Sequence, residues 1–203
     1  MSSVLIREAE LADAEAIARV RVDGWNRVYG EFIPERLPFS WTWEEQTADW
    51  RRELAARNDG KIHLVALEGE EGEIGLGEVL AFASGGPPLR DNVIVEGNTD
   101  AYTTQVYSIY VRPGRYGGGI GTRLLGTLAR RLAEAGHANL HLWALELNPF
   151  RRFYPKLGGR GVARGEWKLR GVTGGEVVVH EMAYAWPDIG VLIEACSAKG
   201  KTE

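Results

Sequence analysis

The sequence has little cysteine and no long hydrophobic run. Its single cysteine, Cys196, excludes an intramolecular disulfide and fits a reducing compartment. The longest apolar runs, such as VLAFA and VVV, are far shorter than the roughly 20 residues of a transmembrane helix. The first residues, MSSVLIREAE, contain neither a basic region nor an apolar core, so no signal peptide is predicted. We therefore expect a soluble cytoplasmic protein.

Basic residues are slightly fewer than acidic residues, and histidine is scarce. Lys and Arg number 24 against 28 Asp and Glu, and a net charge of −4 gives no general attraction to nucleic acid or anionic membranes. The four histidines are His63, His137, His141 and His180. His137 and His141 have a helical spacing, but Gly136 ends a helix before them and the following residues alternate as a strand, so no metal site is expected.

The apolar periodicity predicts an α/β chain with a mixed sheet, in the order β-α-α-β-β-β-α-β-α-β-β. Strands are expected at residues 4–8, 62–67, 77–83, 106–111 and 138–145, followed by a hairpin of residues 162–171 and 176–186. Helices are expected at residues 12–29, 42–57, 122–135 and 149–159. Pro155 is expected to kink or cut the last helix, and residues 84–103 are expected to form a long loop.

A glycine-rich stretch, IYVRPGRYGGGIGTRLLGTL, joins an expected strand to an expected helix at Ile109–Leu128. This geometry suits phosphate, because a helix N-terminus offers unpaired N–H groups and the positive end of its dipole. The P-loop pattern fails, since Gly121 and Gly126 are not followed by lysine. The dinucleotide pattern also fails. It needs glycines at positions i, i+2 and i+5, and neither Gly117 nor Gly119 is followed by a glycine five residues later.

Two motifs resemble those of a known family. IYVRPGRYGGGIGTRLL resembles the acetyl-CoA signature of the GNAT superfamily of N-acetyltransferases, with Gly119 and Gly121 in its glycine positions and Tyr116 in its Arg/Gln position. LNPFRRFYPKLGG is similar to the second signature, with Gly159 where an aromatic residue usually stands. The N-terminal segment resembles the opening strand and paired helices of the family. The resemblance covers roughly residues 4 to 187.

The resemblance implies a GNAT-like α/β fold: a mixed, mostly antiparallel central sheet flanked by helices, with the family's fourth and fifth strands splayed apart. Here these strands are SIYV and ANLHLWAL, and coenzyme A would lie between them. Residues 1–187 would form one N-acetyltransferase domain and residues 188–203 a frayed tail. Acetyl-CoA is the implied co-substrate. The expected cofactor-binding residues are Ile109, Tyr110, Val111, Tyr116, Gly117, Gly118, Gly119, Ile120, Gly121, Thr122, Asn148 and Phe153.

The resemblance also implies a mechanism. Main-chain N–H groups near Ile109 to Val111 would stabilise the oxyanion, and Asn148 would contact the cofactor arm. The phenol of Tyr154 would protonate the leaving thiolate, because its ordinary pKa, about 10, is close to that of a thiol. The arginines beside the loop that could assist the phosphates are Arg112, Arg115 and Arg123.

The acceptor side is less defined. The candidates for a general base are Glu31, Glu78, Glu146 and Tyr107, with a chain of ordered water as the alternative. Trp25, Tyr29 and Glu31 are expected at the acceptor, with Phe32 beside them, because an aromatic wall with a carboxylate suits a cationic amine. Core packing explains Trp25 and Tyr29 equally well. The loop of residues 84–103 is expected to cover the site.

These observations predict an enzyme that transfers an acetyl group from acetyl-CoA to a primary amine of a small molecule or peptide by direct attack. The alternative is a non-catalytic acyl-CoA-binding module that keeps the loop and has lost the chemistry. The expected partner is the amine acceptor, with neither nucleic acid nor membrane. A homodimer is also compatible with the sequence.

Overall fold

The computed structural model describes residues 3–30, 42–56, 60–69, 77–89, 93–170 and 176–199. The strands within these ranges are β1 (Ser3–Glu8), β2 (Ile62–Gly69), β3 (Val79–Gly86), β4 (Val93–Gly97), β5 (Gln105–Val111), β6 (Leu140–Leu145), β7 (Arg160–Arg170) and β8 (Glu176–Trp186). The α-helices are α1 (Ala14–Tyr29), α2 (Trp43–Ala55), α3 (Ile120–Glu134) and α4 (Ile189–Lys199). Short 3-10 helices are η1 (Leu11–Asp13), η2 (Arg151–Phe153) and η3 (Pro155–Leu157).

All eight strands form one sheet in the order β1-β2-β3-β5-β6-β8-β7-β4. Neighbouring strands are antiparallel except β5 and β6, which pair in parallel at Gln105 with His141 and at Val106 with Leu142. Beyond these positions the two strands separate, although β5 stays paired with β3 as far as Val111. The predicted mixed, mostly antiparallel sheet with one splayed strand pair is confirmed.

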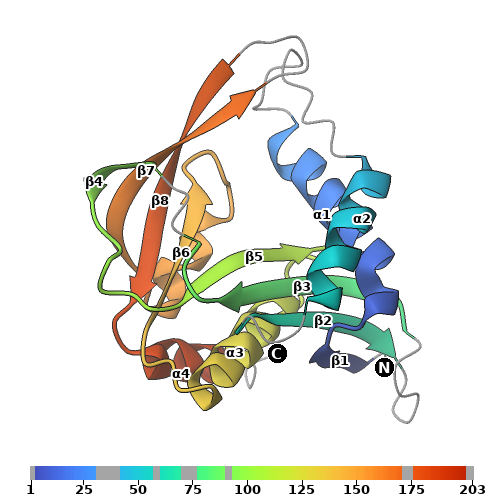
Figure 1. Ribbon diagram of the computed structural model, residues 1–203. Coiled ribbons are helices and arrows are strands. Elements are labelled where there is room, and N and C mark those ends of the chain that lie inside the picture. The colour runs from blue at the N-terminus through green and yellow to red at the C-terminus, as the bar shows by residue number, and fades with distance from the viewer. Residues whose placement is uncertain are drawn as a thin grey trace.

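Helices cover both faces of the sheet, with α1 and α2 on one side and α3 and α4 on the other (Figure 1). The residues buried between the sheet and α3 include Leu80, Leu124, Leu125, Leu128, Leu132 and Leu140. The residues buried beneath α1 and α2 include Ile17, Ala18, Trp50, Val65 and Phe82. Alternate residues of the central strands thus bury their side chains on the two faces of the sheet. A third buried cluster, of Trp25, Tyr29, Leu145 and Val179, contains residues from the end of α1.

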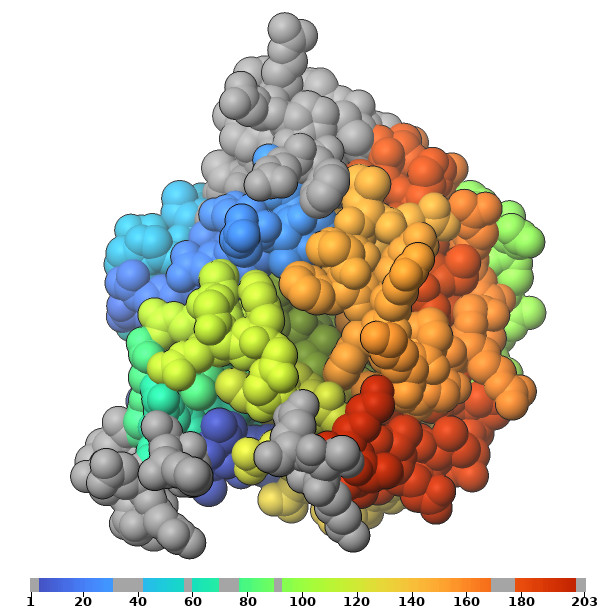
Figure 2. Space-filling view, turned by 180° about the vertical axis from the view of Figure 1, so that it is seen from behind, coloured from blue at the N-terminus to red at the C-terminus, as the bar shows by residue number. Residues whose placement is uncertain are grey.

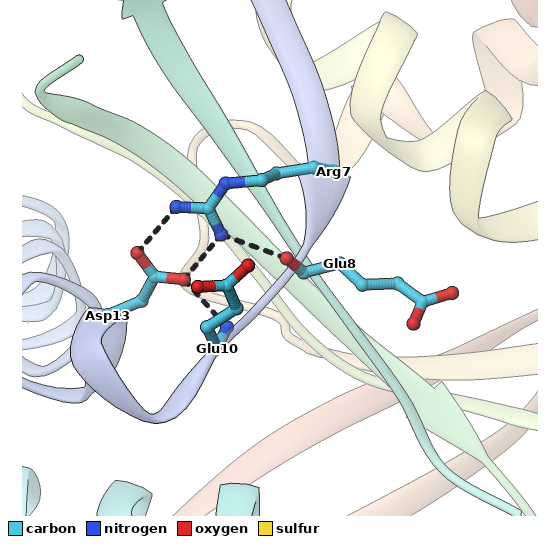
Figure 3. A network of polar contacts seen from close by, with 4 residues as sticks. All are labelled: Arg7, Glu8, Glu10 and Asp13. Atoms are coloured by element: carbon cyan, nitrogen blue, oxygen red, sulfur yellow. Dashed lines mark hydrogen bonds and ion pairs between the residues drawn. The ribbon is translucent and has the colours of Figure 1, made fainter. Parts of the chain in front are cut away.

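An ion pair fixes the beginning of α1 against β1 (Figure 3). Arg7 donates to both carboxylate oxygens of Asp13, at 2.6 and 3.0 Å. The Glu10 N–H donates to the same carboxylate at 2.7 Å. The hydrogen bond with Asp13 raises the pKa of Arg7, so this pair stays charged. It sets where α1 starts and therefore where its last turns lie over the sheet.

The expected long loop is interrupted by a strand. β3 runs on to Gly86, and residues Val93–Gly97 form β4, which pairs with β7 at the edge of the sheet. The prediction of one loop from residue 84 to residue 103 was therefore wrong. The β-branched run in VIVEG carried the strand signal, but the glycines and prolines before it and the polar residues NTD after it concealed it.

The frayed tail predicted for residues 188–203 was wrong for residues 189–199, which form α4. Ile189, Leu192 and Cys196 of α4 are buried in the same core as α3. The two helices approach closely, because a Cβ placed on Gly126 would lie 2.7 Å from the Cβ of Cys196. The expected cut at Pro155 is confirmed, since η2 ends before it and η3 starts at it.

Candidate active site

The segment between β5 and α3 presents backbone N–H groups at a helix N-terminus. Gly119, directly before α3, adopts the left-handed conformation with φ of 69°. Gly117 does the same with φ of 90°, and only glycine takes up this conformation without strain. The first helical bond runs from Arg123 N to Gly119 O at 3.0 Å, so the preceding N–H groups have no partner within the helix. An anion at this point would meet these donors and the positive end of the dipole.

The splay of β5 from β6 exposes further backbone donors. Arg112 N donates to Leu80 O of β3 at 2.8 Å. Because successive residues of a strand direct their N–H groups to opposite sides, those of Ile109 and Val111 point away from β3. They point toward β6, which has separated from β5 at this level. Two N–H groups are therefore aimed into the gap.

A cavity of about 1200 Å³ joins the glycine loop to this gap and is lined from both faces of the sheet. Figure 2 shows the hollow between the segment that contains the glycine loop and the segment that follows β6. All the residues predicted to bind the cofactor line the cavity except Gly118. Tyr154, Trp25 and Tyr29 line it as well. Glu31 and Phe32 lie outside the described residues.

Tyr154 links the two short helices that follow β6. Its side chain is only 8% exposed, and its ring lies 5.5 Å from the ring of Tyr184, centroid to centroid. Burial raises the pKa of Tyr154 well above its ordinary value, with Tyr110 and Tyr184 adding to the effect. The phenol therefore stays protonated at neutral pH and can act as a proton donor in the cavity.

Asn148 ties the end of β6 to α1. Its Oδ1 accepts from Phe150 N at 2.8 Å, and its side chain is hydrogen-bonded to Tyr29. Burial raises the pKa of Tyr29, and the bond with Asn148 opposes that rise. Asn148 lines the cavity, so beside any contact with a ligand it positions Tyr29.

Aromatic rings gather on the α1 side of the gap. The ring centroid of Trp25 lies 4.4 Å from that of Tyr29 and 5.9 Å from that of Trp167 on β7. Glu181 of β8 lines the same cavity and is only 6% exposed. Sequence reasoning missed Trp167 and Glu181, because no spacing connects this hairpin to α1. Glu181 thus provides a carboxylate in the cavity, where Glu31 was expected to provide one.

The other base candidates occupy different places. Glu78 is paired with Arg112, and Glu146 with Arg164 at 2.8 Å; neither glutamate lines the cavity. Tyr107 lines the cavity, but its hydroxyl donates to Pro87 O. These contacts give the two glutamates a structural role.

The three arginines near the glycine loop are also held by the protein. Arg112 pairs with Glu78 and Arg115 with Glu68, while Arg123 donates to Val4 O at 2.8 Å. Arg115 alone of the three lines the cavity. A phosphate bound at this loop would therefore be held mainly by backbone.

The two histidines with helical spacing do not share a helix, because His137 follows α3 and His141 lies in β6. His141 is buried in β6 with Nδ1 3.0 Å from Thr104 O, and burial lowers its pKa. In the part of the chain that the structure describes, no group of three or more His, Cys, Asp or Glu could hold a metal ion. Among the same residues, no helix is both long and apolar enough to span a membrane.

Residues 25–158 match the model of the acetyltransferase (GNAT) family. The chain belongs to this family. The uncharacterized N-acetyltransferase YuaI of Bacillus subtilis (strain 168) is 30% identical over 189 residues, which span 93% of this chain and 96% of YuaI. The GNAT resemblance drawn from the two motifs is thereby confirmed.

Solved structures share the GNAT fold. PaiA N-acetyltransferase from Thermoplasma acidophilum matches with a TM-score of 0.63 and 18% identity, over 91% of this chain and 99% of that chain. An N-acetyltransferase from Staphylococcus aureus Mu50 matches with a TM-score of 0.59 and 19% identity, over 93% and 99% of the two chains. YncA from Salmonella typhimurium matches with a TM-score of 0.57 and 24% identity, over 91% and 94%.

The structure shows what surrounds Tyr116 and Gly159, the two residues that depart from the GNAT motifs. Tyr116, in the Arg/Gln position, places its ring 5.1 Å from that of Phe150, centroid to centroid, and both residues line the cavity. Gly159 stands in the aromatic position because a Cβ there would lie 2.7 Å from the Trp186 ring. Trp186, whose indole N–H donates to Leu157 O at 2.8 Å, fills this region from β8.

Proposed function

We propose that this GNAT protein transfers the acetyl group of acetyl-CoA to a primary amine of a small molecule or peptide by direct attack. The observation that carries the proposal is the cavity that crosses the sheet at the splay. It joins the backbone donors of the glycine loop to the aromatic and acidic side chains beneath α1. The PaiA and YncA structures contain coenzyme A and acetyl-CoA, respectively, which supports acetyl-CoA as the co-substrate here.

The backbone of the loop fits the diphosphate of such a co-substrate. A Cβ added at Gly117 or Gly118 would meet no atom within 4 Å, so the loop faces open space that an anion can occupy. The N–H groups at the start of α3 would bind phosphate oxygens. The N–H groups of Ile109 and Val111 would bind the pantetheine arm and the thioester oxygen in the gap.

Acetyl transfer then needs charge stabilisation and proton transfer at the gap. As an amine attacks, the thioester oxygen gains negative charge, and N–H groups aimed at it lower the barrier. Tyr154 would donate its proton to the departing thiolate. Its raised pKa keeps the phenol protonated at neutral pH. The same rise makes it a weaker acid than an ordinary phenol, so the pKa match with a thiol does not hold here, and the proton moves as the basic thiolate forms beside it.

The α1 side of the cavity supports an acceptor that arrives as an ammonium ion. Trp25, Tyr29 and Trp167 supply aromatic faces, and Glu181 supplies a buried carboxylate. Aromatic faces and a carboxylate both attract an ammonium group. An amine held there would lie beside the gap into which the Ile109 N–H points.

A screen of primary amines with acetyl-CoA, read by the release of free thiol, tests this proposal. We expect thiol release that depends on both the amine and Tyr154. Binding of acetyl-CoA without thiol release from any amine would contradict the proposal and favour the non-catalytic module.

A further inference from the structure

A row of polar side chains crosses the sheet and ends at the gap. His63 of β2 is the register partner of Ser84 of β3, and Ser84 is the register partner of Ser108 of β5. Directly opposed residues share a face and have Cβ atoms about 5 Å apart. The row therefore ends at Ser108, the residue before Ile109, whose N–H points into the gap.

The row lies on the face covered by α1 and α2. Residues two apart in a strand share a face. Val65 lies two residues after His63, and Phe82 lies two residues before Ser84. Both pack beneath these helices. A register shift follows Ser84 in the pairing of β3 with β5. Such irregularities bend a strand and change the aim of nearby side chains.

A hydrogen bond within the row and an ion-pair contact beyond it connect the row to α2. Ser84 Oγ lies 2.8 Å from His63 Nδ1, and His63 Nε2 lies 3.7 Å from Glu53 Oε1. A carboxylate beside Nε2 favours the tautomer with its proton on that nitrogen. Nδ1 is then free to accept from the Ser84 hydroxyl. The Trp50 ring stands edge-on to the imidazole, 5.6 Å between centroids, and restricts its orientation.

The cavity reaches the serine end of the row. Ser84 and Ser108 line it, as do Glu53 and Lys61, whereas His63 does not. Ser84 is only 3% exposed, so its hydroxyl reaches solvent mainly through the cavity. A proton can therefore leave the gap through Ser84 toward the imidazole of His63, whose side chain is 13% exposed.

We infer that Ser84 and His63 carry away the proton that the acceptor nitrogen loses, an inference that rests on the proposed acetyl transfer. The bound ammonium ion first releases one proton to solvent through the cavity, and the neutral nitrogen then forms its bond to the thioester carbon. Its surplus proton then passes to Ser84 Oγ, directly or through Ser108, while the proton of Ser84 passes to His63 Nδ1. The carbon–sulfur bond breaks, and the sulfur takes the proton of Tyr154.

Exchange with solvent restores both side chains. The His63 imidazolium releases one proton to water, and the Tyr154 phenolate takes one up. Glu53 stabilises the imidazolium while it exists, since its carboxylate faces Nε2. Ser84 faces the substrate and is the catalytic residue of this path. His63 acts through Ser84 and is a positioning residue that stores the proton.

The charged groups around His63 define its pH response. Glu53 of α2 faces it, and Lys61, directly before β2, binds Glu53 Oε1 at 2.7 Å. Asp49 of α2 and Arg21 of α1 line the cavity. The N–H of Ala9, directly after β1, donates to His63 O at 2.9 Å. A protonated imidazole cannot accept from Ser84, so activity falls as the pH drops through the imidazole titration, between about pH 5 and 8.

The test is kcat/KM against pH for the wild type, His63→Gln and Ser84→Ala, with an alkylamine identified by the amine screen. We expect each substitution to lower kcat/KM at pH 7.5 by about 100-fold and to remove the inflection between pH 5 and 8. His180→Gln is the matched control, because His180 lies on β8 outside the cavity. It should retain both the rate and the inflection. Acetyl-CoA affinity, measured on each variant, reports that the fold is intact.

A less basic acceptor sharpens the test. A β-fluorinated analogue of the same amine loses its proton more easily, so His63→Gln should impair its acetylation less than that of the parent amine. An unchanged pH profile in His63→Gln would overturn the inference, as would loss of the inflection in Glu181→Gln alone. A wild type that acetylates no amine would instead contradict the proposed function itself.

Discussion

The two ends of the cavity are built in different ways. The end proposed to bind the co-substrate consists of backbone: the left-handed glycines before α3 and the N–H groups that the splay exposes on β5. The end proposed to bind the acceptor consists of side chains from α1, α2, β7 and β8. A backbone site depends on local conformation, whereas a side-chain site depends on which distant elements meet. Substitutions should therefore affect co-substrate binding at one end and acceptor use at the other.

The largest effect is expected where the two ends meet. Tyr154→Phe should lower turnover by about 100-fold or more, because it removes the proton donor, while acetyl-CoA affinity stays nearly unchanged. The raised pKa of Tyr154 also predicts that phenolate formation causes no loss of turnover up to about pH 10. Steady-state kinetics and calorimetric titration measure these quantities. Tyr184→Phe, which alters the neighbouring ring outside the cavity, serves as control, and an equal loss there would remove the role of Tyr154.

Gly119→Val should weaken acetyl-CoA binding at the end of the cavity that is built from backbone. Valine in the left-handed conformation costs at least 1–2 kcal/mol, so the loop shifts and acetyl-CoA affinity falls by about 30-fold. Gly136→Val carries the same strain, since Gly136 has φ of 95°, but it lies outside the cavity. Calorimetry should show normal affinity for that variant. Equal losses in both would mean that backbone strain, and not the cradle, causes the effect.

Glu181→Gln should affect the acceptor end alone. Loss of the buried carboxylate removes the charge that attracts an ammonium ion, so KM for the amine should rise by about 10-fold. The KM for acetyl-CoA should stay within twofold. Glu166→Gln, on the neighbouring strand β7 and outside the cavity, is the control. A change in the acetyl-CoA KM would show that the two ends are not separate.

Tyr116→Ala should give the smallest effect and sharpen the boundary between the ends. The Tyr116–Phe150 contact joins the glycine loop to the segment after β6, and aromatic pairs contribute about 0.5–1.5 kcal/mol. Acetyl-CoA affinity should fall by about threefold to tenfold, and Tyr116→Phe should restore it. If the phenylalanine variant binds as weakly as the alanine variant, the hydroxyl matters and the ring contact does not.

The same contrast explains what the sequence could predict. The glycine loop and the strand before it form one continuous segment, so their motif predicted the local conformation, and the family resemblance implied the gap to β6. Trp167 and Glu181 reach the acceptor end only through the β7–β8 hairpin, and Ser84 meets His63 only through strand register. No local pattern encodes such meetings. Helix α4 did carry a signal, the helical spacing of Ile189, Leu192 and Cys196, which the polar SAKGKTE ending obscured.

The most direct test of the account is an initial-rate matrix in which acetyl-CoA and an accepted amine are varied together. Two ends of one cavity that meet at the gap require both substrates to be bound before the acetyl group moves. The account therefore predicts intersecting double-reciprocal lines and no release of thiol without amine. Parallel lines with a burst of thiol before amine is added would indicate a covalent acetyl-enzyme and contradict direct attack.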